Sequence, residues 1–205
     1  MLKYFLYILP AAAAIGLAAG GFHLYRVAQK NKKEMAPYMK GEIRVDRPFG
    51  KVLVVYYSLS GQTRKIADII REKTGADVYE IKTAEKIDTT PWFYLTLRKQ
   101  LKTGKYPDIS ENLPDFAKYD LIFVGSPIWW YTAATPVLSF LEKADFHGRK
   151  VVPFSTQGSN YGTFFEDFAA KAQNAQILKG QSFNNLPAEY DHAVDNKISV
   201  WLNKL

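Results

Sequence analysis

The sequence predicts an α/β domain built as a three-layer, doubly wound sheet of five parallel strands, preceded by one N-terminal transmembrane helix. Between residues 51 and 205, apolar β-rich runs alternate with amphipathic runs five times. Strands joined by helices of this length are normally parallel, with right-handed crossovers and helices on both faces of the sheet. A closed eight-fold barrel would need about 250 residues, far more than this region holds. Ahead of the domain, residues 4–25 carry no Lys, Arg, Asp or Glu.

Residues 1–25 are expected to form a membrane anchor. The 22 positions from residue 4 to residue 25 span about 33 Å as an α-helix, enough to cross a hydrocarbon core of about 30 Å. The alternative is a cleaved signal peptide, because the small residues around Leu17-Ala18-Ala19 resemble a cleavage site. A lipid anchor on cysteine is excluded, since the chain has no cysteine.

Residues 26–50 follow the anchor as a basic juxtamembrane linker, expected to be a short helical continuation and then extended chain. Four cations come closely after the apolar stretch and are offset by a single glutamate: Arg26, Lys30, Lys32 and Lys33. Because an excess of Lys and Arg marks the cytoplasmic flank of a span, we expect a single-pass protein of the cell membrane with its domain on the cytoplasmic face. A signal-anchor orientation, with the domain outside, is the alternative.

The charge of the chain is concentrated before the domain. Residues 1–47 contain eight Lys and Arg against three Asp and Glu, which leaves nineteen against seventeen for the remainder of a chain whose net charge is +7. A nearly neutral domain without RNA-binding motifs does not predict nucleic-acid binding. The absence of cysteine excludes disulfides, thiolate nucleophiles and iron–sulfur clusters. The three histidines have no metal-pair spacing, so no metal site is predicted.

Five apolar runs predict the strands of the sheet: residues 51–57, 76–81, 119–125, 150–156 and 175–183. The first run, KVLVVYY, is almost continuously apolar, as expected for a strand buried on both faces. Five amphipathic runs predict the helices that follow the strands: residues 63–75, 91–104, 135–146, 163–173 and 189–205. The order strand–helix, repeated five times, is what places the strands in one parallel sheet.

The helix boundaries follow from glycine and proline. Gly75 and Gly104 stop the first and second helices, because glycine accepts the left-handed conformation of a C-terminal cap. Pro91 opens the second helix, where its missing N–H costs nothing. In the last helix, the apolar spacing predicts which residues face inward: Val194, Ile198, and Trp201 or Leu202.

The segment SLSGQT, residues 58–63, lies where the first strand ends and the first helix begins. A helix N-terminus presents unpaired N–H groups and the positive end of the helix dipole, which together favour a bound anion. The hydroxyls of Ser58, Ser60 and Thr63 add donors, and Gly61 lets the main chain wrap closely around an anion. The spacings of a Walker loop and of a GxGxxG turn are both absent. The segment therefore predicts a phosphate cradle, with an ordinary Ser/Thr-rich helix cap as the alternative.

Two further loops follow strand ends. The segment GSPIWWYTAATP, residues 125–136, puts two tryptophans and Tyr131 beyond the third strand. These rings either pack under neighbouring loops as a satellite core or form a wall for a planar aromatic ligand. The segment STQGSNYG, residues 155–162, supplies small polar residues after the fourth strand. Because ligands of such sheets bind at the carboxyl ends of the strands, the three loops together predict one crevice with an anion site and an aromatic wall.

The segment YYSLSGQT resembles the phosphate loop of the flavodoxin family. Residues 120–158 are similar to the other two flavin-contacting segments of a flavodoxin-like subfamily of FMN-dependent oxidoreductases. The resemblance covers about residues 50–205 and implies a flavodoxin-like fold with FMN as the cofactor. It implies that the phosphate of FMN is held by Ser58, Ser60, Gly61, Gln62 and Thr63. It also implies that the isoalloxazine ring is lined by Pro127, Ile128, Trp129, Trp130 and Tyr131, and closed on its other side by Thr156, Gln157 and Gly158.

Two features depart from the family pattern. Relatives often carry THGGSG in the last loop, where this chain has TQGSNYG, so Gln157 replaces a histidine and Ser159 a glycine. Electron-shuttling flavodoxins are typically strongly acidic, whereas this domain is nearly neutral and lacks steering by complementary charge. No catalytic side chain is assigned, because in a flavoenzyme the ring accepts the hydride while the protein supplies position and electrostatics.

The sequence therefore predicts a membrane-tethered, FMN-binding redox protein that reduces a small acceptor such as a quinone, with NAD(P)H as the donor. A flavodoxin-type electron carrier to a protein partner is one alternative, and a scaffold that kept the fold and lost the flavin is another. The expected partners are the membrane, through the N-terminal helix, together with the donor and the small-molecule acceptor. The oligomeric state is left open.

Overall fold

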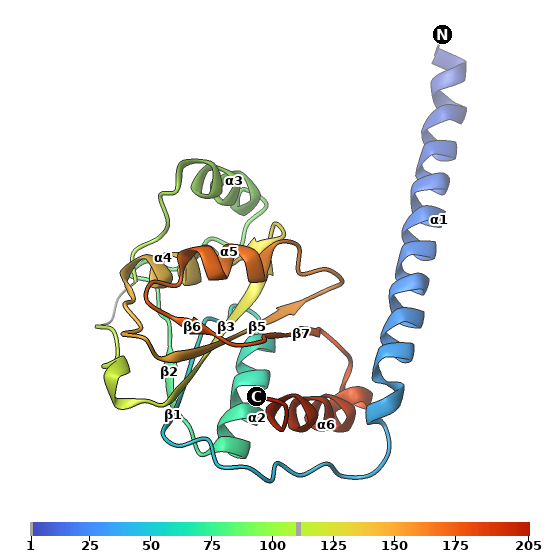
Figure 1. Cartoon of the computed structure of the whole chain (residues 1–205). Coiled ribbons are helices and arrows are strands. Elements are labelled where there is room, and N and C mark those ends of the chain that lie inside the picture. Colours follow the sequence, from blue (N-terminus) through green and yellow to red (C-terminus); the bar gives the residue numbers. More distant parts are fainter. Residues whose placement is uncertain (1, 110–111) are drawn as a thin grey trace.

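A parallel β-sheet forms the centre of the chain. The computed structural model describes the backbone of residues 2–109 and 112–205. It describes the side chains of residues 10, 13–109 and 112–205. The strands lie in the order β2-β1-β3-β5, and both β6 and β7 pair with β5 (Figure 1). These pairings are all parallel. The strands are β1 Val52–Tyr56, β2 Asp77–Glu80, β3 Leu121–Trp129, β5 Lys150–Gln157, β6 Gln176–Ile177 and β7 Gln181–Asn184.

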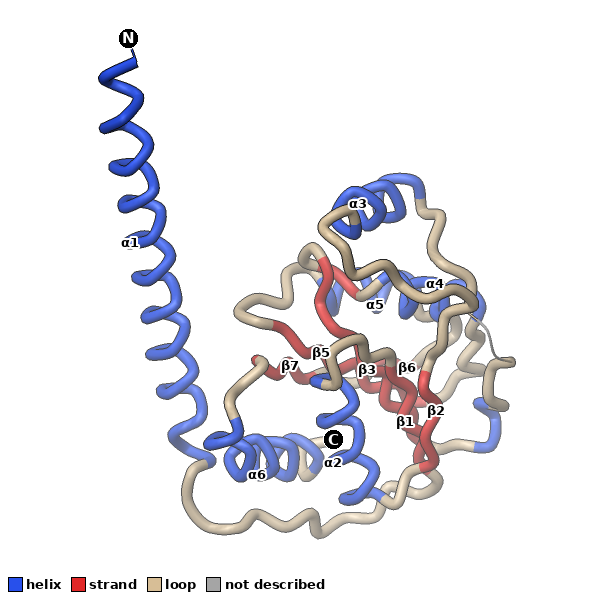
Figure 2. Tube along the Cα trace, turned by 180° about the vertical axis from the view of Figure 1, so that it is seen from behind, coloured by secondary structure: helices blue, strands red, loops and turns tan. Residues whose placement is uncertain are grey.

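Helices cover both faces of the sheet, as predicted (Figures 1 and 2). One face carries α2 and α6, and the other carries α4 and α5, with α3 outside them. Alternate residues of β1 divide between these layers: Val52 and Val54 join the core under α2 and α6, whereas Leu53 and Val55 join the core under α4 and α5. A strand buried on both faces produces this alternation. The helices are α2 Gln62–Thr74, α3 Phe93–Thr103, α4 Thr135–Lys143, α5 Phe164–Lys171 and α6 Asp191–Leu202.

The sequence signals for the helix ends and for the inward face of α6 are confirmed. Gly75 and Gly104 are the C-caps of α2 and α3, each with a left-handed φ of 68°. Every α6 position expected to face inward is buried: Val194, Ile198, Trp201 and Leu202. Two polar residues of α6, Asn196 and Lys197, are also buried. The apolar pattern did not predict them, because their partners lie in the N-terminal part of the chain.

The structure differs from the sequence prediction at two strands. The third strand continues to Trp129 and turns back as the short antiparallel strand β4 (Thr132–Ala133). The fifth strand, predicted over residues 175–183, is divided into β6 and β7. Between the two pieces, a Cβ on Gly180 would lie 2.4 Å from the carbonyl oxygen of Pro153. Since proline has no N–H to give to a strand ladder, regular pairing is interrupted beside it.

A long helix, α1 (Leu2–Met35), stands beside the domain, and its N-terminal end points away from the sheet (Figure 1). A 3-10 turn, Ala36–Tyr38, follows it. Within the described part of the chain, no helix combines the length and the apolar content needed to cross a membrane. Much of the predicted anchor, namely residues 1–9, 11 and 12, lies outside the residues whose side chains are described.

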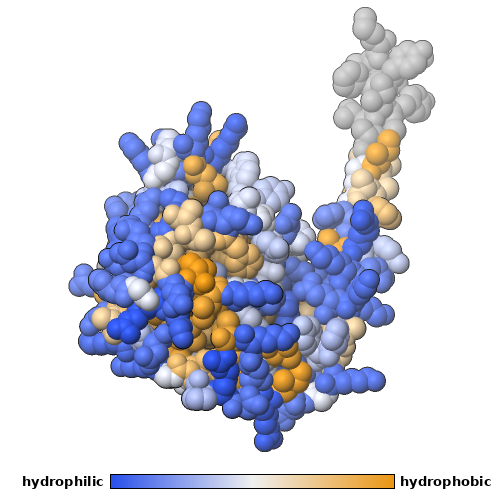
Figure 3. Space-filling model, viewed as in Figure 1, coloured by the Kyte–Doolittle hydropathy of each residue, from blue (hydrophilic) through white to orange (hydrophobic). Residues whose placement is uncertain are grey.

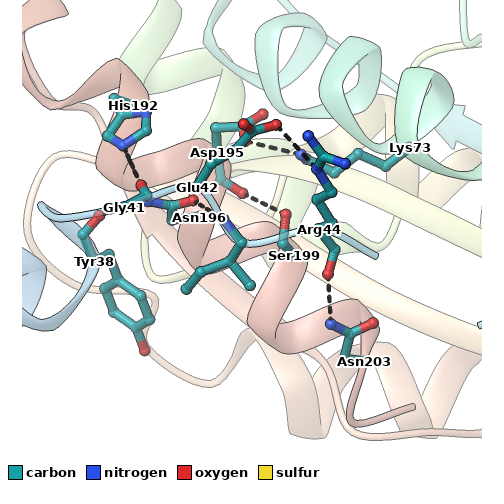
Figure 4. Close-up of polar contacts among 11 residues, drawn as sticks. Tyr38, Gly41, Glu42, Arg44, Lys73, His192, Asp195, Asn196, Ser199 and Asn203 are labelled. Atoms are coloured by element: carbon teal, nitrogen blue, oxygen red, sulfur yellow. Dashed lines mark hydrogen bonds and ion pairs between the residues drawn. The ribbon is translucent and has the colours of Figure 1, made fainter. Parts of the chain in front are cut away.

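Residues 36–47, here called the strap, run along α6 and are bound to it (Figure 4). The buried side chain of Asn196 holds the strap at three points. Its Oδ1 accepts a hydrogen bond from the backbone N–H of Ile43 at 2.8 Å, and its Nδ2 donates to the carbonyl oxygens of Tyr38 at 2.8 Å and Gly41 at 2.9 Å. The extended chain expected here is present, but it is not a free linker, because these tertiary hydrogen bonds fix it to the domain.

The C-terminal end of α1 is fastened to the same part of the domain. Glu34 Oε1 accepts a hydrogen bond from Lys197 Nζ at 2.7 Å, and the same Nζ donates to the carbonyl oxygen of Ser182 at 3.0 Å. Asn31 Oδ1 accepts a hydrogen bond from Asn184 Nδ2 at 2.7 Å. These contacts join α1 to α6 and to β7, so the position of α1 depends on two elements near the end of the chain.

Candidate functional site

The loop after β1 leads directly into α2, whose N-cap is Gly61. No side-chain hydrogen bond from the N-cap closes this end of α2, so the first-turn N–H groups and the positive end of the helix dipole are directed at the loop. Within the loop, Ser58 Oγ accepts a hydrogen bond from Gly61 N at 3.1 Å. Ser60 is exposed and Gln62 is half-buried. This arrangement fits an anion at the start of α2.

The backbone conformation at Gly61 gives a second reason for glycine, beside the close approach of an anion that the sequence suggested. Its φ is 88°, in the left-handed region that residues with a Cβ adopt only at a cost. A Cβ at this position would meet no atom within 4 Å. Glycine is therefore required by the backbone conformation of the turn, and no protein atom restricts the space beside it.

The loop after β3 is a tight hairpin whose two turn residues are Trp130 and Tyr131. Their φ angles are 51° and 68°, the double left-handed conformation of a type I′ turn, which normally selects Asn and Gly. Trp130 is 49% exposed and Tyr131 is 60% exposed. Large residues held in this conformation store backbone strain of order 1–3 kcal/mol each, and such strain is commonly found at functional sites.

Trp129, just before the turn, lies in a small aromatic cluster. Its ring meets Tyr57 edge-on at 5.6 Å and Phe93 edge-on at 5.0 Å between centroids. Trp129 therefore packs as part of a satellite core, which is the alternative that the sequence left open for this segment. Pro127 and Ile128 are half-buried beside it. Of the three rings predicted to form the aromatic wall, only those of the turn residues Trp130 and Tyr131 are exposed.

The carboxyl end of β5, where the third predicted loop begins, contributes buried polar side chains. Gln157 Oε1 accepts a hydrogen bond from Ser155 Oγ at 3.0 Å, and Gln157 Nε2 donates to Asn184 Oδ1 at 3.1 Å. Asn184 in turn donates to Asn31 of α1. The residue that replaces the family's histidine is thus used in a hydrogen-bonded chain that runs from β5 to α1. Gly158, next along the loop, is exposed.

The structure brings the three predicted loops together at one edge of the sheet. Thr63 Oγ1 lies 2.8 Å from Thr156 Oγ1, which joins the first loop to the third. The carbonyl oxygen of Tyr131 accepts a hydrogen bond from Thr163 N at 2.9 Å, which joins the second loop to the third. The predicted hydroxyls are therefore not equivalent: Thr63 is 1% exposed and bonded to another loop, whereas Ser60 faces outward.

Tyr57 lies beside the candidate site and was not among the residues predicted for it. It closes the first apolar run and is buried against Trp129. Burial, and secondly the negative charge of Glu80, raises the pKa of Tyr57 to about 12. The phenol is therefore a neutral donor throughout the physiological range. Its position directly before the loop was visible in the sequence, but a tyrosine at the end of a strand is indistinguishable from ordinary core there.

A groove lies beside the third loop, between that loop and α1. Its volume is about 970 Å³. The α1 wall carries the cationic side chains of Arg26 and Lys30, and the domain wall includes Gln157 and Tyr161. The sequence did not predict this groove, because nothing in the residue pattern showed that α1 lies next to the third loop.

Fold and site together define the class of protein. The carboxyl edge of a doubly wound sheet, with an uncapped helix start and an exposed aromatic hairpin, is the architecture of a flavin mononucleotide-binding protein. The chain belongs to the flavodoxin family, whose model matches residues 51–205. This match confirms the family expected from the sequence, and with it FMN as the cofactor of the family. None of the curated proteins matches the chain.

Solved structures similar to the chain include flavoproteins. A flavoprotein from Lactobacillus acidophilus NCFM, in complex with FMN, is 28% identical with a TM-score of 0.59, over 65% of this chain and 93% of that one. A proposed flavoprotein from Bacteroides uniformis is 29% identical with a TM-score of 0.62, over 73% of this chain and 98% of that one. A third structure, from Bacteroides eggerthii, is 24% identical with a TM-score of 0.57, over 74% of this chain and 98% of that one. At this identity the likeness shows the fold alone.

Proposed function

We propose that this chain is a membrane-tethered, FMN-dependent oxidoreductase that uses NAD(P)H to reduce a small acceptor such as a quinone. The observation that carries the flavin part is the meeting of three loops at one edge of the sheet, through the Thr63–Thr156 and Tyr131–Thr163 hydrogen bonds. FMN, when bound, supplies the transfer of hydride or single electrons, and the chain supplies binding and orientation.

The described residues fit this cofactor. The phosphate of FMN would be held at the uncapped start of α2 by the loop residues Ser58, Ser60, Gly61 and Gln62. Thr63 supports them from behind, since its hydroxyl is already bonded to Thr156. The ring would lie between the hairpin and the third loop, against Pro127, Ile128, Trp130, Tyr131, Thr156, Gln157 and Gly158. Trp129 would position the hairpin through its contacts with Tyr57 and Phe93.

We assign the groove beside the third loop to the NAD(P)H donor. Its volume of about 970 Å³ is at the upper end of the range for small-molecule pockets. Arg26 and Lys30 on its α1 wall are cations of the kind that bind the phosphates of a dinucleotide. Gln157 belongs both to this groove and to the loop that would close the flavin, so a donor bound there would lie beside the flavin.

A one-electron carrier to a protein partner is the second candidate. The exposed rings of Trp130 and Tyr131 favour it, because exposed aromatic side chains are enriched where proteins dock. Against it, the domain is nearly neutral, with nineteen Lys and Arg against seventeen Asp and Glu after residue 47. Such a domain lacks the charge that speeds the encounter of a shuttle with its partners.

Two measurements test these candidates. The visible absorbance spectrum of the purified chain, before and after addition of FMN, should show a bound flavin. A chain that stays colourless after FMN addition is a scaffold, and both redox functions are then wrong. Steady-state oxidation of NAD(P)H with soluble quinones follows. Turnover supports the oxidoreductase, whereas a flavin that is reduced only through a partner protein supports the carrier.

The tether is the part of the proposal that comes from the sequence. Residues 1–25 would lie in the cell membrane, and residues 26–205 on its cytoplasmic face, because Arg26, Lys30, Lys32 and Lys33 follow the apolar stretch. FMN and NAD(P)H are both available in the cytoplasm. Protease treatment of cells whose outer wall is removed tests the orientation. Digestion of the domain while a cytoplasmic marker survives would overturn it.

A further inference from the structure

The large exposed hydrophobic side chains of the described residues are concentrated in two places. Five of them lie on α1, and seven lie on α3 or in the three loops at the carboxyl edge of the sheet. Only Met39 and Val78 lie elsewhere. The seven are Leu59, Trp92, Tyr94, Leu95, Trp130, Tyr131 and Tyr161. Apolar and aromatic side chains gathered on one side of a domain mark a docking surface.

Helix α3 combines these rings with positive charge. Trp92 at its N-cap is 69% exposed, and Tyr94 and Leu95 follow it on the outside. The basic residues Arg98, Lys99 and Lys102 of α3 are also exposed, and residues 89–107 contain no Asp or Glu. The inner side of the helix is fixed to the domain by the buried Leu97 and the half-buried Leu101. The outer side thus pairs tryptophan, tyrosine and leucine with cations and carries no acid.

This composition matches an anionic lipid surface better than a protein surface. Trp and Tyr prefer the headgroup level of a bilayer, where the ring is apolar and its polar atom stays wet. Lys and Arg beside them are attracted to anionic headgroups. The same combination is typical of helices that lie in the plane of the membrane interface. In the surface view, hydrophilic side chains project from the α3 end of the domain around an apolar patch (Figure 3).

The direction of α1 agrees with this assignment. Figures 1 and 2 show α3 on the side of the sheet toward which α1 rises, whereas α2 and α6 lie on the opposite side. The C-terminal end of α1 is fixed to the domain through Glu34 and Asn31. A bilayer reached by the N-terminal end of α1 therefore lies on the α3 side of the domain, and not on the α6 side.

We propose that α3, together with the Trp130–Tyr131 turn, docks on the surface of an anionic bilayer. Trp92, Tyr94 and Leu95 enter the headgroup region, and Arg98, Lys99 and Lys102 bind lipid phosphates. The proposal rests on the tether in the proposed function and goes beyond it, because it fixes which side of the domain meets the lipid. It places the flavin edge at the membrane surface, where a lipid-soluble acceptor is delivered.

Hydrogen–deuterium exchange of the full chain in vesicles tests the proposal. The chain is reconstituted in neutral phosphatidylcholine vesicles and in vesicles that also contain phosphatidylglycerol, and exchange is compared over residues 89–107. We expect this segment to be protected in the anionic vesicles and to exchange faster in the neutral ones. Replacing Arg98, Lys99 and Lys102 with Glu should lower the equilibrium constant for docking by on the order of a hundredfold, since each cation is worth roughly a factor of five at such a surface.

A matched variant controls for net charge. Lys118, Lys143 and Lys150 are exposed at the amino edge of the sheet, and replacing them with Glu should leave protection of residues 89–107 unchanged. The docking proposal is overturned if α3 exchanges equally in both vesicle types. It is also overturned if α3 is protected in detergent without lipid, which indicates a second copy of the chain. A chain that fails to sediment with vesicles instead overturns the tether on which the docking rests. Flavin absorbance of the same samples reports the proposed function separately, because FMN binding does not depend on α3 docking.

Discussion

The hydroxyl oxygen of Thr63 lies 2.8 Å from the hydroxyl oxygen of Thr156, and both side chains are buried. Thr63 belongs to the first turn of α2, and Thr156 to the end of β5. One hydrogen bond therefore fixes the phosphate loop against the loop on the other side of the flavin edge. The hydrogen bond gives Thr63 a positioning role for the loop. The direct phosphate contact implied by the family resemblance stays a prediction.

Replacing Thr63 with Ala should weaken FMN binding by roughly tenfold, because loss of the bond also leaves the buried hydroxyl of Thr156 unpaired. Titration of the apoprotein with FMN measures the effect. Thr156→Ala should weaken binding to a similar extent, and the double variant should cost little more than either single one, since the two residues share one interaction. Fully additive losses would show that Thr63 contacts the phosphate independently.

Replacing Gly61 with Val should destabilise the chain by about 1–2 kcal/mol, because a left-handed φ is unfavourable for a residue with a Cβ. Gly61→Asn is the matched control, since Asn tolerates this conformation better and the surrounding space is open. Chemical unfolding of the apoprotein measures both variants. Equal losses for Val and Asn would contradict the conformational explanation.

Replacing Tyr131 with Gly should have opposite effects on stability and on FMN binding. Glycine relieves the strain of the left-handed turn, so the free energy of unfolding of the apoprotein should rise by about 1 kcal/mol. Loss of the exposed ring should weaken FMN about two- to tenfold if that ring stacks on the flavin. Tyr131→Phe keeps both ring and strain and should change neither quantity. A Gly variant that binds FMN normally would remove Tyr131 from the wall.

The buried phenol of Tyr57 should make the chain sensitive to alkaline pH. Its pKa of about 12 in the folded state is raised from 10.0, so its contribution to stability is complete below pH 10 and is lost as pH rises toward 12. Thermal unfolding as a function of pH should therefore show a smaller alkaline loss in Tyr57→Phe than in the natural chain. Tyr161→Phe, at an exposed tyrosine of the same edge, should leave the loss as it is.

Replacing Glu34 with Gln should destabilise the docking of α1, because the charge of Lys197 would remain buried without its partner. Lys197 is 6% exposed, but the side chain of Glu34 is 37% exposed, so screening limits the expected cost to about 1–2 kcal/mol. Urea unfolding measures it. Glu34→Gln with Lys197→Met should recover part of the loss, and Glu42→Gln, at the exposed pair with Arg44, should change little.

The elements that depend on local signals were predictable from the sequence. Gly75 and Gly104 end their helices because glycine accepts the left-handed cap, and this preference acts within a few residues. The three loops were located because each follows an apolar run, and parallel strands bring their carboxyl ends together. Neither inference needs knowledge of distant contacts.

The elements that depend on distant partners were not predictable in the same way. Asn196 is buried only because residues 38–43 return to it, more than 150 positions away along the chain. The Trp130–Tyr131 turn violates the usual preference for Asn and Gly, so its sequence carries no turn signal. The division of the fifth strand depends on how closely Gly180 passes Pro153, which no residue pattern records.

The fastening of α1 also sets an order of events during synthesis. Glu34 and Lys197 are 163 positions apart, and a ribosome adding about 5–20 residues per second needs roughly 8–30 s to cover that distance. For most of this interval α1 and the strap have been made, but the helix that binds them has not. The contacts that hold the C-terminal end of α1 therefore form only when α6 is complete.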